Sequence, residues 1–532
     1  MYKRSLLLFW CCLLPAGLLS QPWIPDAGDG TYVNPVIHAD YSDPDVIRVG
    51  DDFFMVSSSF NCVPGLPVLH SKDLVNWKIV NHIIDRMPPE EVFSIPRHGN
   101  GVWAPSLRYH GGMYYVFFGD PDFGIYMSKT DDPFGQWEPL KLIREARGWI
   151  DPCPLWDDDG NAYLVHAFAG SRSGIKSVLV VRRMEPDGSA LPGEGVLVYD
   201  GHDENRTIEG PKFYKRNGYY YIFAPAGGVT PGWQTVLRSR NPFGPYEIRT
   251  VMHQGPTDIN GPHQGGWVEL KNGDSWFVHF QDKGPYGRVV HLNPVTWNDG
   301  WPLIGVDING DGIGEPVTRH QKPQVKARVA PHGPQTTDEF NDIHTGLQWQ
   351  WHANPREEWM FNSGKLGFMR LYCTLPPEEQ PNHWETPHLL LQKFPAPSFS
   401  ATARLNFHPM MDGDRAGLII MGTDYSTLTL EQAEGRTYIT HVICRDADQG
   451  APEETVERIE AESAVIFLRV QVEEGGRCTF AYSYDGQNFT GMENPFTAVA
   501  GRWIGAKVGL FAGSRQRTND RGWADVDWFR IE

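Results

Sequence analysis

Short apolar runs, separated by polar turns that contain glycine, fill the first two-thirds of the chain. Five segments share one plan: a small or acidic residue beside Pro or Gly, an apolar strand, a tight turn and an aromatic strand. They begin at Asp43, Ala104, Asp151, Glu209 and Gly265. The spacing of about 50 to 60 residues lies near the length of β-propeller blades. We therefore predict a five-bladed β-propeller over residues 30–322.

The pattern changes after residue 322. Residues 323–335 are rich in Pro, Gln, Lys and His, which is typical of a linker. From residue 336 to residue 532, strand-length apolar runs such as 399–407 and 464–472 do not align with the repeat. They predict two packed antiparallel sheets. The predicted fold class is all-β, with the propeller followed by a β-sandwich.

Composition narrows the function classes. The formal net charge of −18 disfavours binding to nucleic acid or to an anionic membrane, since both need a clustered basic surface. The 19 Trp and 20 Tyr residues supply flat rings of the kind that stack on sugars, although most rings in a β protein fill the core. A neutral, sugar-like partner is the best match.

The N-terminus predicts export to the periplasm or the extracellular space. Lys3 and Arg4 precede the apolar run 6–19, so residues 1–20 resemble a signal peptide, and no later segment predicts a membrane span. Five cysteines remain beyond residue 20. Their scattered spacing indicates neither a zinc site nor a disulfide framework, and a single bridge stays open.

Three of the five repeats open with a carboxylate: Asp43, Asp151 and Glu209. The inner strands of a propeller surround one axis, so residues at equivalent repeat positions converge on one face. Asp-Pro and Asp-Gly pairs are also ordinary turn elements, which would explain any one of these residues alone. Three converging carboxylates suit glycosidic bond hydrolysis, in which an acid protonates the leaving oxygen and a base activates water or attacks the sugar.

Several longer motifs resemble those of glycoside hydrolase family 43. They are Asn34-Pro-Val, Ser42-Asp-Pro-Asp, His70-Ser-Lys-Asp-Leu-Val-Asn-Trp77, Trp103-Ala-Pro, Trp149-Ile-Asp-Pro and Ile208-Glu-Gly-Pro. The resemblance covers nearly the whole chain after residue 20 and implies a five-bladed propeller, an inverting reaction and a concanavalin-like second domain. It also implies that Asp43 is the general base, Glu209 the general acid and Asp151 the residue that tunes and orients the acid.

The same resemblance implies further site residues. Arg288 would contact the terminal sugar, against the alternative of a surface ion pair. Phe60 and Trp103 would line the sugar pocket, unless they are core aromatics. His263 would face a central channel that could hold a calcium ion, although no cofactor is required, and a lone His is more often just hydrogen-bonded.

A separate stretch, 307–312, matches the first half of a calcium-binding EF-hand loop, but Thr318 occupies the twelfth position instead of Glu. An Asx-rich turn is the simpler interpretation, and no metal site is predicted there.

The sugar is predicted from one substitution. Cys62 stands where xylosidases of this layout are expected to have an aromatic residue, and a smaller pocket wall favours an exo-acting α-L-arabinofuranosidase on plant polysaccharide. The alternatives are a β-D-xylosidase and, from another class, a non-catalytic carbohydrate-binding propeller. A retaining enzyme of the invertase type is disfavoured because its Trp-Met-Asn-Asp-Pro-Asn signature is missing.

Overall fold

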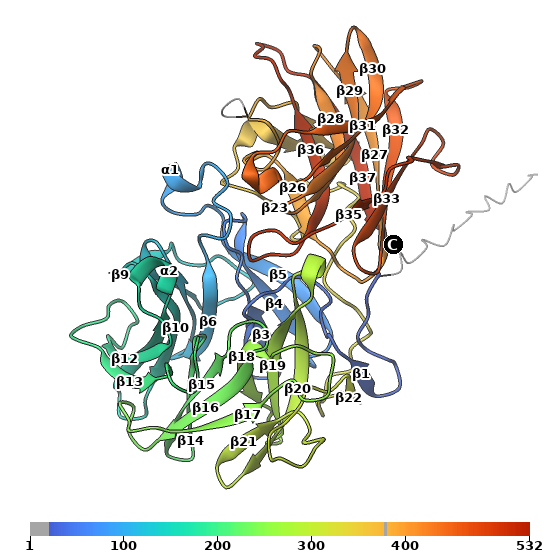
Figure 1. Ribbon diagram of the computed structural model, residues 1–532. Coiled ribbons are helices and arrows are strands. Elements are labelled where there is room, and N and C mark those ends of the chain that lie inside the picture. The colour runs from blue at the N-terminus through green and yellow to red at the C-terminus, as the bar shows by residue number, and fades with distance from the viewer. Residues whose placement is uncertain (1–20, 377–379) are drawn as a thin grey trace, which may run out of the picture.

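The computed structural model describes residues 21–376 and 380–532 and shows two β domains (Figure 1). The predicted export signal, residues 1–20, lies outside the described residues. None of the helices in the two described ranges combines the length and the apolar composition that crossing a bilayer requires. The prediction of an all-β chain is confirmed.

The first domain is a propeller of five four-stranded blades, each an antiparallel meander of consecutive strands. Blade 1 contains β2 (Asp45–Val49), β3 (Asp52–Val56), β4 (Gly65–Ser71) and β5 (Trp77–Ile84). Blade 2 contains β6 (Trp103–His110), β7 (Met113–Asp120), β8 (Gly124–Thr130) and β9 (Lys141–Glu145). Blade 3 contains β10 (Trp149–Trp156), β11 (Ala162–Phe168), β12 (Val178–Met184) and β13 (Val196–Asp200). Blade 4 contains β14 (Lys212–Arg216), β15 (Tyr219–Ala226), β16 (Trp233–Ser239) and β17 (Glu247–Met252). Blade 5 contains β18 (His263–Glu269), β19 (Ser275–Asp282), β20 (Arg288–Asn298) and β21 (Trp301–Ile304).

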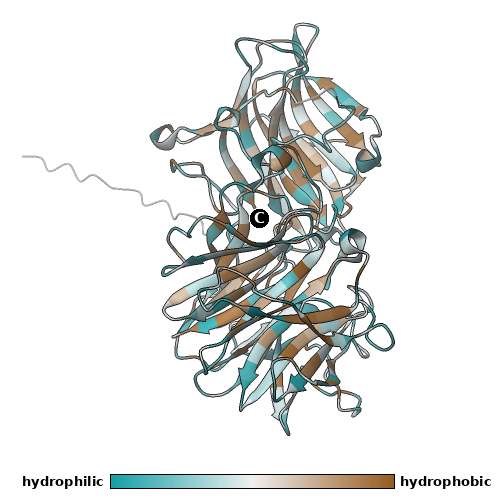
Figure 2. Ribbon diagram, turned by 90° about the vertical axis from the view of Figure 1, so that its left-hand side faces the viewer, coloured by the Kyte–Doolittle hydropathy of each residue, from teal (hydrophilic) through white to brown (hydrophobic). Residues whose placement is uncertain are grey.

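Apolar residues from neighbouring blades pack into separate clusters, one of which joins blades 1 and 5 through Val46, Met55, Val278 and Val290. In Figure 2 hydrophobic stretches, coloured brown, run along the strands, while many loops are hydrophilic. Burial on both faces explains why the second strands, such as β7 and β15, read as nearly continuous apolar runs. Among the described residues, no blade combines strands from the two ends of the propeller sequence. Instead, the short pair of β1 (Thr31–Val33) and β22 (Arg319–Gln321) joins the segment before blade 1 to the segment after blade 5.

The second domain is a sandwich of two antiparallel sheets. The seven-stranded sheet contains, in order, β23 (Gln350–Trp351), β26 (Leu390–Lys393), β36 (Lys507–Gly513), β28 (Arg415–Met421), β29 (Tyr425–Ala433), β30 (Arg436–Cys444) and β31 (Glu454–Glu460). The eight-stranded sheet contains β24 (Met360–Asn362), β25 (Met369–Tyr372), β37 (Trp523–Ile531), β27 (Phe399–His408), β32 (Val465–Glu473), β33 (Arg477–Ser483) and β34 (Thr490–Gly491), with β35 (Phe496–Thr497) paired to β33.

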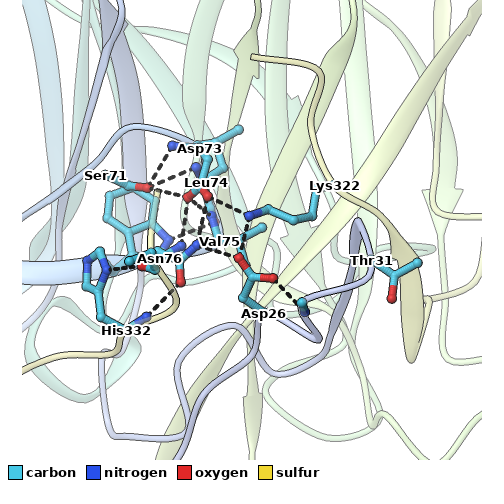
Figure 3. Close-up of polar contacts among 12 residues, drawn as sticks. Asp26, Thr31, Ser71, Asp73, Leu74, Val75, Asn76, Lys322 and His332 are labelled. Atoms are coloured by element: carbon cyan, nitrogen blue, oxygen red, sulfur yellow. Dashed lines mark hydrogen bonds and ion pairs between the residues drawn. The ribbon is translucent and has the colours of Figure 1, made fainter. Parts of the chain in front are cut away.

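The segment predicted to be a linker, together with Lys322 just before it, is held against blade 1 by buried polar contacts (Figure 3). Lys322 Nζ lies 2.5 Å from Asp26 Oδ2 and 2.9 Å from Asp73 Oδ2. Asn76 donates to Asp26 and accepts from the backbone N–H of His332. These contacts join the first described residues, the β4–β5 turn and the connecting segment, so the two domains are not separated by a free tether.

Direct contacts also fix the sandwich to the propeller. Val63 and Trp351 exchange backbone hydrogen bonds of 3.0 and 2.5 Å. The hydroxyl of Tyr286, in the propeller, donates to the carbonyl of Pro397, and its ring is buried in the sandwich core. This packing brings a loop of the second domain to the face of the propeller described next.

Candidate active site

Near the start of each of the five inner strands, one residue has the same unusual backbone conformation. A positive φ of +53°, +34°, +57°, +57° and +36° occurs at Asp43, Ala104, Asp151, Gly210 and Gln264 respectively. Such values are uncommon outside glycine, and strained residues of this kind gather at functional sites. Their recurrence once per blade identifies these five residues as the equivalent positions.

Glu209 therefore precedes the equivalent position by one residue, and the prediction that all three carboxylates occupy equivalent positions is wrong for it. Gly210 is the true counterpart of Asp43 and Asp151. A Cβ atom at Gly210 would lie 2.6 Å from Gln264 Cδ, so only glycine fits there without displacing that side chain. Its backbone N–H donates to Asp151 Oδ2 at 2.7 Å.

The predicted residues nevertheless surround one pocket of about 790 Å³ on this face of the propeller. It is lined by Asp43, Asp151, Glu209, Phe60, Trp103, His263 and Arg288, together with residues that the sequence analysis missed, among them Phe168, Lys176, Thr207, Asp282 and Trp503. The volume is typical of small-molecule sites. The β-strand pattern alone could not place Phe60 or Arg288 there, because neither opens an inner strand.

Asp43 is buried and fully supplied with hydrogen bonds on one oxygen. Ser58 and Ser42 donate to Asp43 Oδ2 at 2.5 and 2.8 Å. Arg288 Nη1 lies 3.7 Å from Asp43 Oδ1 and donates to Ser42 Oγ at 2.7 Å. Arg288 is only 7% exposed, so the alternative of a surface ion pair is wrong. These contacts fix the orientation of the Asp43 carboxyl group and leave Oδ1 without a hydrogen bond from the described part of the chain.

Asp151 and Glu209 differ in exposure. Asp151 is 1% exposed, and burial, followed by the nearby charges of Glu209 and Asp43, raises its pKa well above the ordinary value. The Glu209 side chain is 24% exposed and faces the pocket, with its Oε1 3.0 Å from His263 Nε2. Glu209 is therefore the carboxyl group that can reach a bound substrate, whereas Asp151 lies behind it in the protein interior.

A buried ammonium group lies below these carboxylates. Lys212, two residues beyond Gly210 in blade 4, is fully buried, and its Nζ donates to Pro105 O at 2.9 Å and to Ser106 Oγ at 3.0 Å. Both acceptors belong to blade 2, which does not adjoin blade 4, so Lys212 reaches across the propeller axis. Its charge opposes the rise of the Asp151 pKa. The sequence analysis missed Lys212, although its position near the start of β14 was a usable signal.

The second domain contributes Trp503 to the pocket. This residue precedes β36, is half exposed, and holds its ring centroid 5.7 Å from the Arg288 guanidinium carbon. Gly99 permits the close approach, because a Cβ atom there would lie 2.8 Å from Trp503 Cδ1. Sequence reasoning within the propeller repeat had no means of finding a residue that tertiary packing delivers from about 200 positions beyond the last blade.

Cys62 does not form the pocket wall. It is 1% exposed, is absent from the pocket lining, and its Sγ lies 2.9 Å from Lys507 Nζ of the sandwich. The argument that a small residue at position 62 enlarges the sugar pocket is therefore wrong. The side chain is directed toward the domain interface, which the strand pattern of blade 1 could not reveal.

His263 is the residue at which a calcium ion was expected. Its imidazole is hydrogen-bonded to Glu209, and within the described ranges it belongs to no group of three or more His, Cys, Asp or Glu side chains that could hold a metal ion. A group of that kind is formed by His253, Asp311 and Glu315, next to the 307–312 stretch. There Asp307 accepts hydrogen bonds from Gly310 N and Gly312 N, as in the predicted Asx-rich turn.

Comparisons with known proteins agree with this geometry. The family model "Glycosyl hydrolases family 43" matches residues 32–302, and "Beta xylosidase C-terminal Concanavalin A-like domain" matches residues 337–532. A putative beta-xylosidase of Xylanibacter ruminicola is 38% identical, with 91% of this chain and 86% of that protein covered. A non-reducing end alpha-L-arabinofuranosidase of Bacteroides ovatus is 28% identical, with 94% of each chain covered. A crystal structure of a GH43 protein of Bacillus licheniformis matches with a TM-score of 0.81 at 27% identity, covering 94% of this chain and 99% of that one.

Proposed function

The chain belongs to glycosyl hydrolases family 43, and from this membership we propose that it is an exo-acting, inverting glycosidase that releases terminal β-D-xylose from plant polysaccharide or oligosaccharide. The observation that carries the proposal is the single pocket in which Asp43, Asp151 and Glu209 meet. Asp43 accepts hydrogen bonds from Ser42 and Ser58, Asp151 is buried with a raised pKa, and the Glu209 side chain faces the pocket.

The roles follow from these environments. Glu209 gives its proton to the departing glycosidic oxygen, because its carboxyl group is the more exposed of the two and faces the pocket. Asp151 tunes this acid through its nearby charge, and the hydrogen bond that it accepts from the Gly210 N–H fixes its orientation. Asp43 removes a proton from the attacking water, and the bond forms on the face of the sugar opposite to the departing oxygen.

Binding of the terminal sugar is assigned to Arg288, Phe60, Trp103 and Trp503. The guanidinium donates to ring hydroxyls, and the aromatic faces pack on the sugar. We further propose export, with residues 1–20 removed, and the expected test is N-terminal sequencing of the secreted protein.

We propose xylose rather than arabinofuranose as the released sugar for two reasons. The pocket argument for arabinofuranose rested on Cys62, which lies outside the pocket. Relatives with the higher identities, at 38% and 32%, carry xylosidase names. The second candidate, an α-L-arabinofuranosidase, is supported by the Bacteroides ovatus relative, which matches along 94% of this chain.

The deciding experiment compares initial rates on aryl β-D-xyloside and aryl α-L-arabinofuranoside, with Glu209→Gln and Asp43→Asn alongside. We expect faster xyloside cleavage and losses of about 10²- to 10⁴-fold in each variant. Proton NMR of the first product anomer should show inverted configuration. A faster rate on the arabinoside would change only the identity of the proposed sugar, to α-L-arabinofuranose. Retained configuration would refute the role of Asp43, and no cleavage of either glycoside would leave a carbohydrate-binding protein.

A further inference from the structure

A second pocket, in the sandwich, has nearly the same size as the catalytic one. Its volume is about 810 Å³, and it lies at the end of the seven-stranded sheet where β28 begins and β36 ends. It shares no lining residue with the catalytic pocket. Its polar lining includes His383, His388, Arg415, Glu453, Ser514, Arg515 and Arg517.

Two buried imidazoles line this pocket with unused hydrogen-bonding capacity. Within the described chain, neither ring nitrogen of His388 has a hydrogen-bond partner, although the residue is 3% exposed. His383, also 3% exposed, uses Nδ1 toward Thr386 Oγ1, while its Nε2 lies 3.6 Å from Glu453 Oε1 without a hydrogen bond. Burial lowers the pKa of both to about 3, so both rings are neutral and each can donate and accept. Buried polar groups are rarely left unpaired, which indicates a missing polar ligand.

The charge of the pocket is positive. Arg415 is paired with Glu453 through contacts of 2.8 and 3.1 Å, and this carboxylate also accepts from the Tyr425 hydroxyl. Arg515 and Arg517 are exposed at the rim. Arg515 Nη2 lies 3.5 Å from the same Glu453 carboxylate. Three guanidinium groups and one carboxylate thus line the pocket, in a chain whose formal net charge is −18. An anion is the complementary ligand, since a guanidinium pairs with a carboxylate through two parallel hydrogen bonds.

We propose that this pocket binds a saccharide that carries a carboxylate, namely a uronic acid unit attached to a xylan fragment. The rim guanidiniums would pair with the carboxylate. The neutral groups deeper in the pocket, His383, His388 and Ser514, would bond the sugar hydroxyls. An inorganic anion would use the charges and leave the buried imidazoles unpaired. The choice of a xylan fragment rests on the function proposed above, whereas the pocket and its charge do not.

One propeller loop contacts sandwich residues that are neighbours of each pocket. His98 stacks on Trp384, the neighbour of His383, with ring centroids 3.6 Å apart. The next residue, Gly99, packs against Trp503 at the catalytic pocket. A polysaccharide held by its acidic side group on the sandwich would therefore remain close to the catalytic pocket, which raises the local concentration of chain ends.

The test is calorimetric binding to the full chain carrying Glu209→Gln, so that no probe is hydrolysed. The probes are xylotriose bearing a glucuronic acid side group, plain xylotriose and inorganic sulfate. The double variant Arg515→Ser/Arg517→Ser removes the rim charges. The matched control, Arg436→Ser/Arg477→Ser, removes two exposed arginines of the same domain that pair with Glu460 and Glu473. Thermal unfolding checks that each variant is folded.

We expect the acidic probe to bind at least tenfold more weakly to the Arg515/Arg517 variant than to the control, while plain xylotriose binds both equally. Equal affinity of the acidic probe for the two variants would overturn the site. Sulfate binding as tightly as the acidic probe would overturn the saccharide assignment. Aryl glycoside hydrolysis by the unmodified chain is measured separately, so failure of the proposed function and failure of this site give different results.

Discussion

Replacing Asp151 with Asn is expected to stabilise the protein while it removes most of the activity. Asp151 is 1% exposed, and burial together with Glu209 and Asp43 raises its pKa. A carboxyl group whose pKa is raised in the folded state binds its proton more tightly there than in the unfolded chain. The folded state therefore loses stability as the pH rises above the unfolded value of about 3.9 and through the raised folded value. Asparagine has the same shape and carries no charge.

Two opposing contributions set the size of the effect. Asparagine keeps an oxygen for the Gly210 N–H, now 2.7 Å from Asp151 Oδ2, but a bond to a neutral acceptor is weaker by about 1 kcal/mol. Removing a buried charge relieves a desolvation cost of roughly 2 to 4 kcal/mol. The net gain at neutral pH is about 1 to 3 kcal/mol, or roughly 2 to 5 °C in Tm. Loss of the proton partner of Glu209 lowers kcat/KM by about 10²-fold or more.

The assay is calorimetric Tm of the unmodified chain and of Asp151→Asn between pH 5 and pH 8, with kcat/KM measured at the same pH values. The Tm difference should grow with pH. Asp187→Asn is the control, because Asp187 is exposed and its pKa is lowered, so that variant gains no stability as the pH rises. A Tm difference that is constant with pH, or a destabilised Asp151→Asn, would refute the reasoning.

Further measurements probe other groups around the pocket. Lys212→Met removes the ammonium below Asp151, so both limbs of the pH–rate profile should move about one pH unit to the alkaline side; an unmoved profile contradicts this. Trp503→Ala should raise KM about tenfold with little change in kcat, and equal changes in both would contradict a role in sugar binding. Gly210→Ala should cost about 1 to 3 kcal/mol of stability, more than Gly160→Ala, where φ is also positive but no atom lies within 4 Å. Dialysis against EDTA should leave most of the activity, because the proposed acid, base and buried positive charge are all supplied by side chains. A large loss of activity that calcium restores would contradict this expectation.

The sequence by itself determined the fold class and indicated three carboxylates that line one pocket in the structure. Strand and turn preferences are local, so an apolar run, a Gly-containing turn and an aromatic run predict a hairpin wherever they occur. Their repetition predicted five blades, and the structure has five. Asp43, Asp151 and Glu209 could be selected because inner strands around one axis must begin near one another.

Only the tertiary structure decided the rest, because each remaining feature depends on segments distant in the chain. The one-residue offset of Glu209 became visible through the φ angle of Gly210. Lys212 reaches across the axis to Ser106, and Trp503 arrives from the other domain. The direction of Cys62 toward Lys507 depends on how the domains pack. A sequence pattern records which residues alternate along a strand, but it does not record which distant strand or loop each side chain will meet.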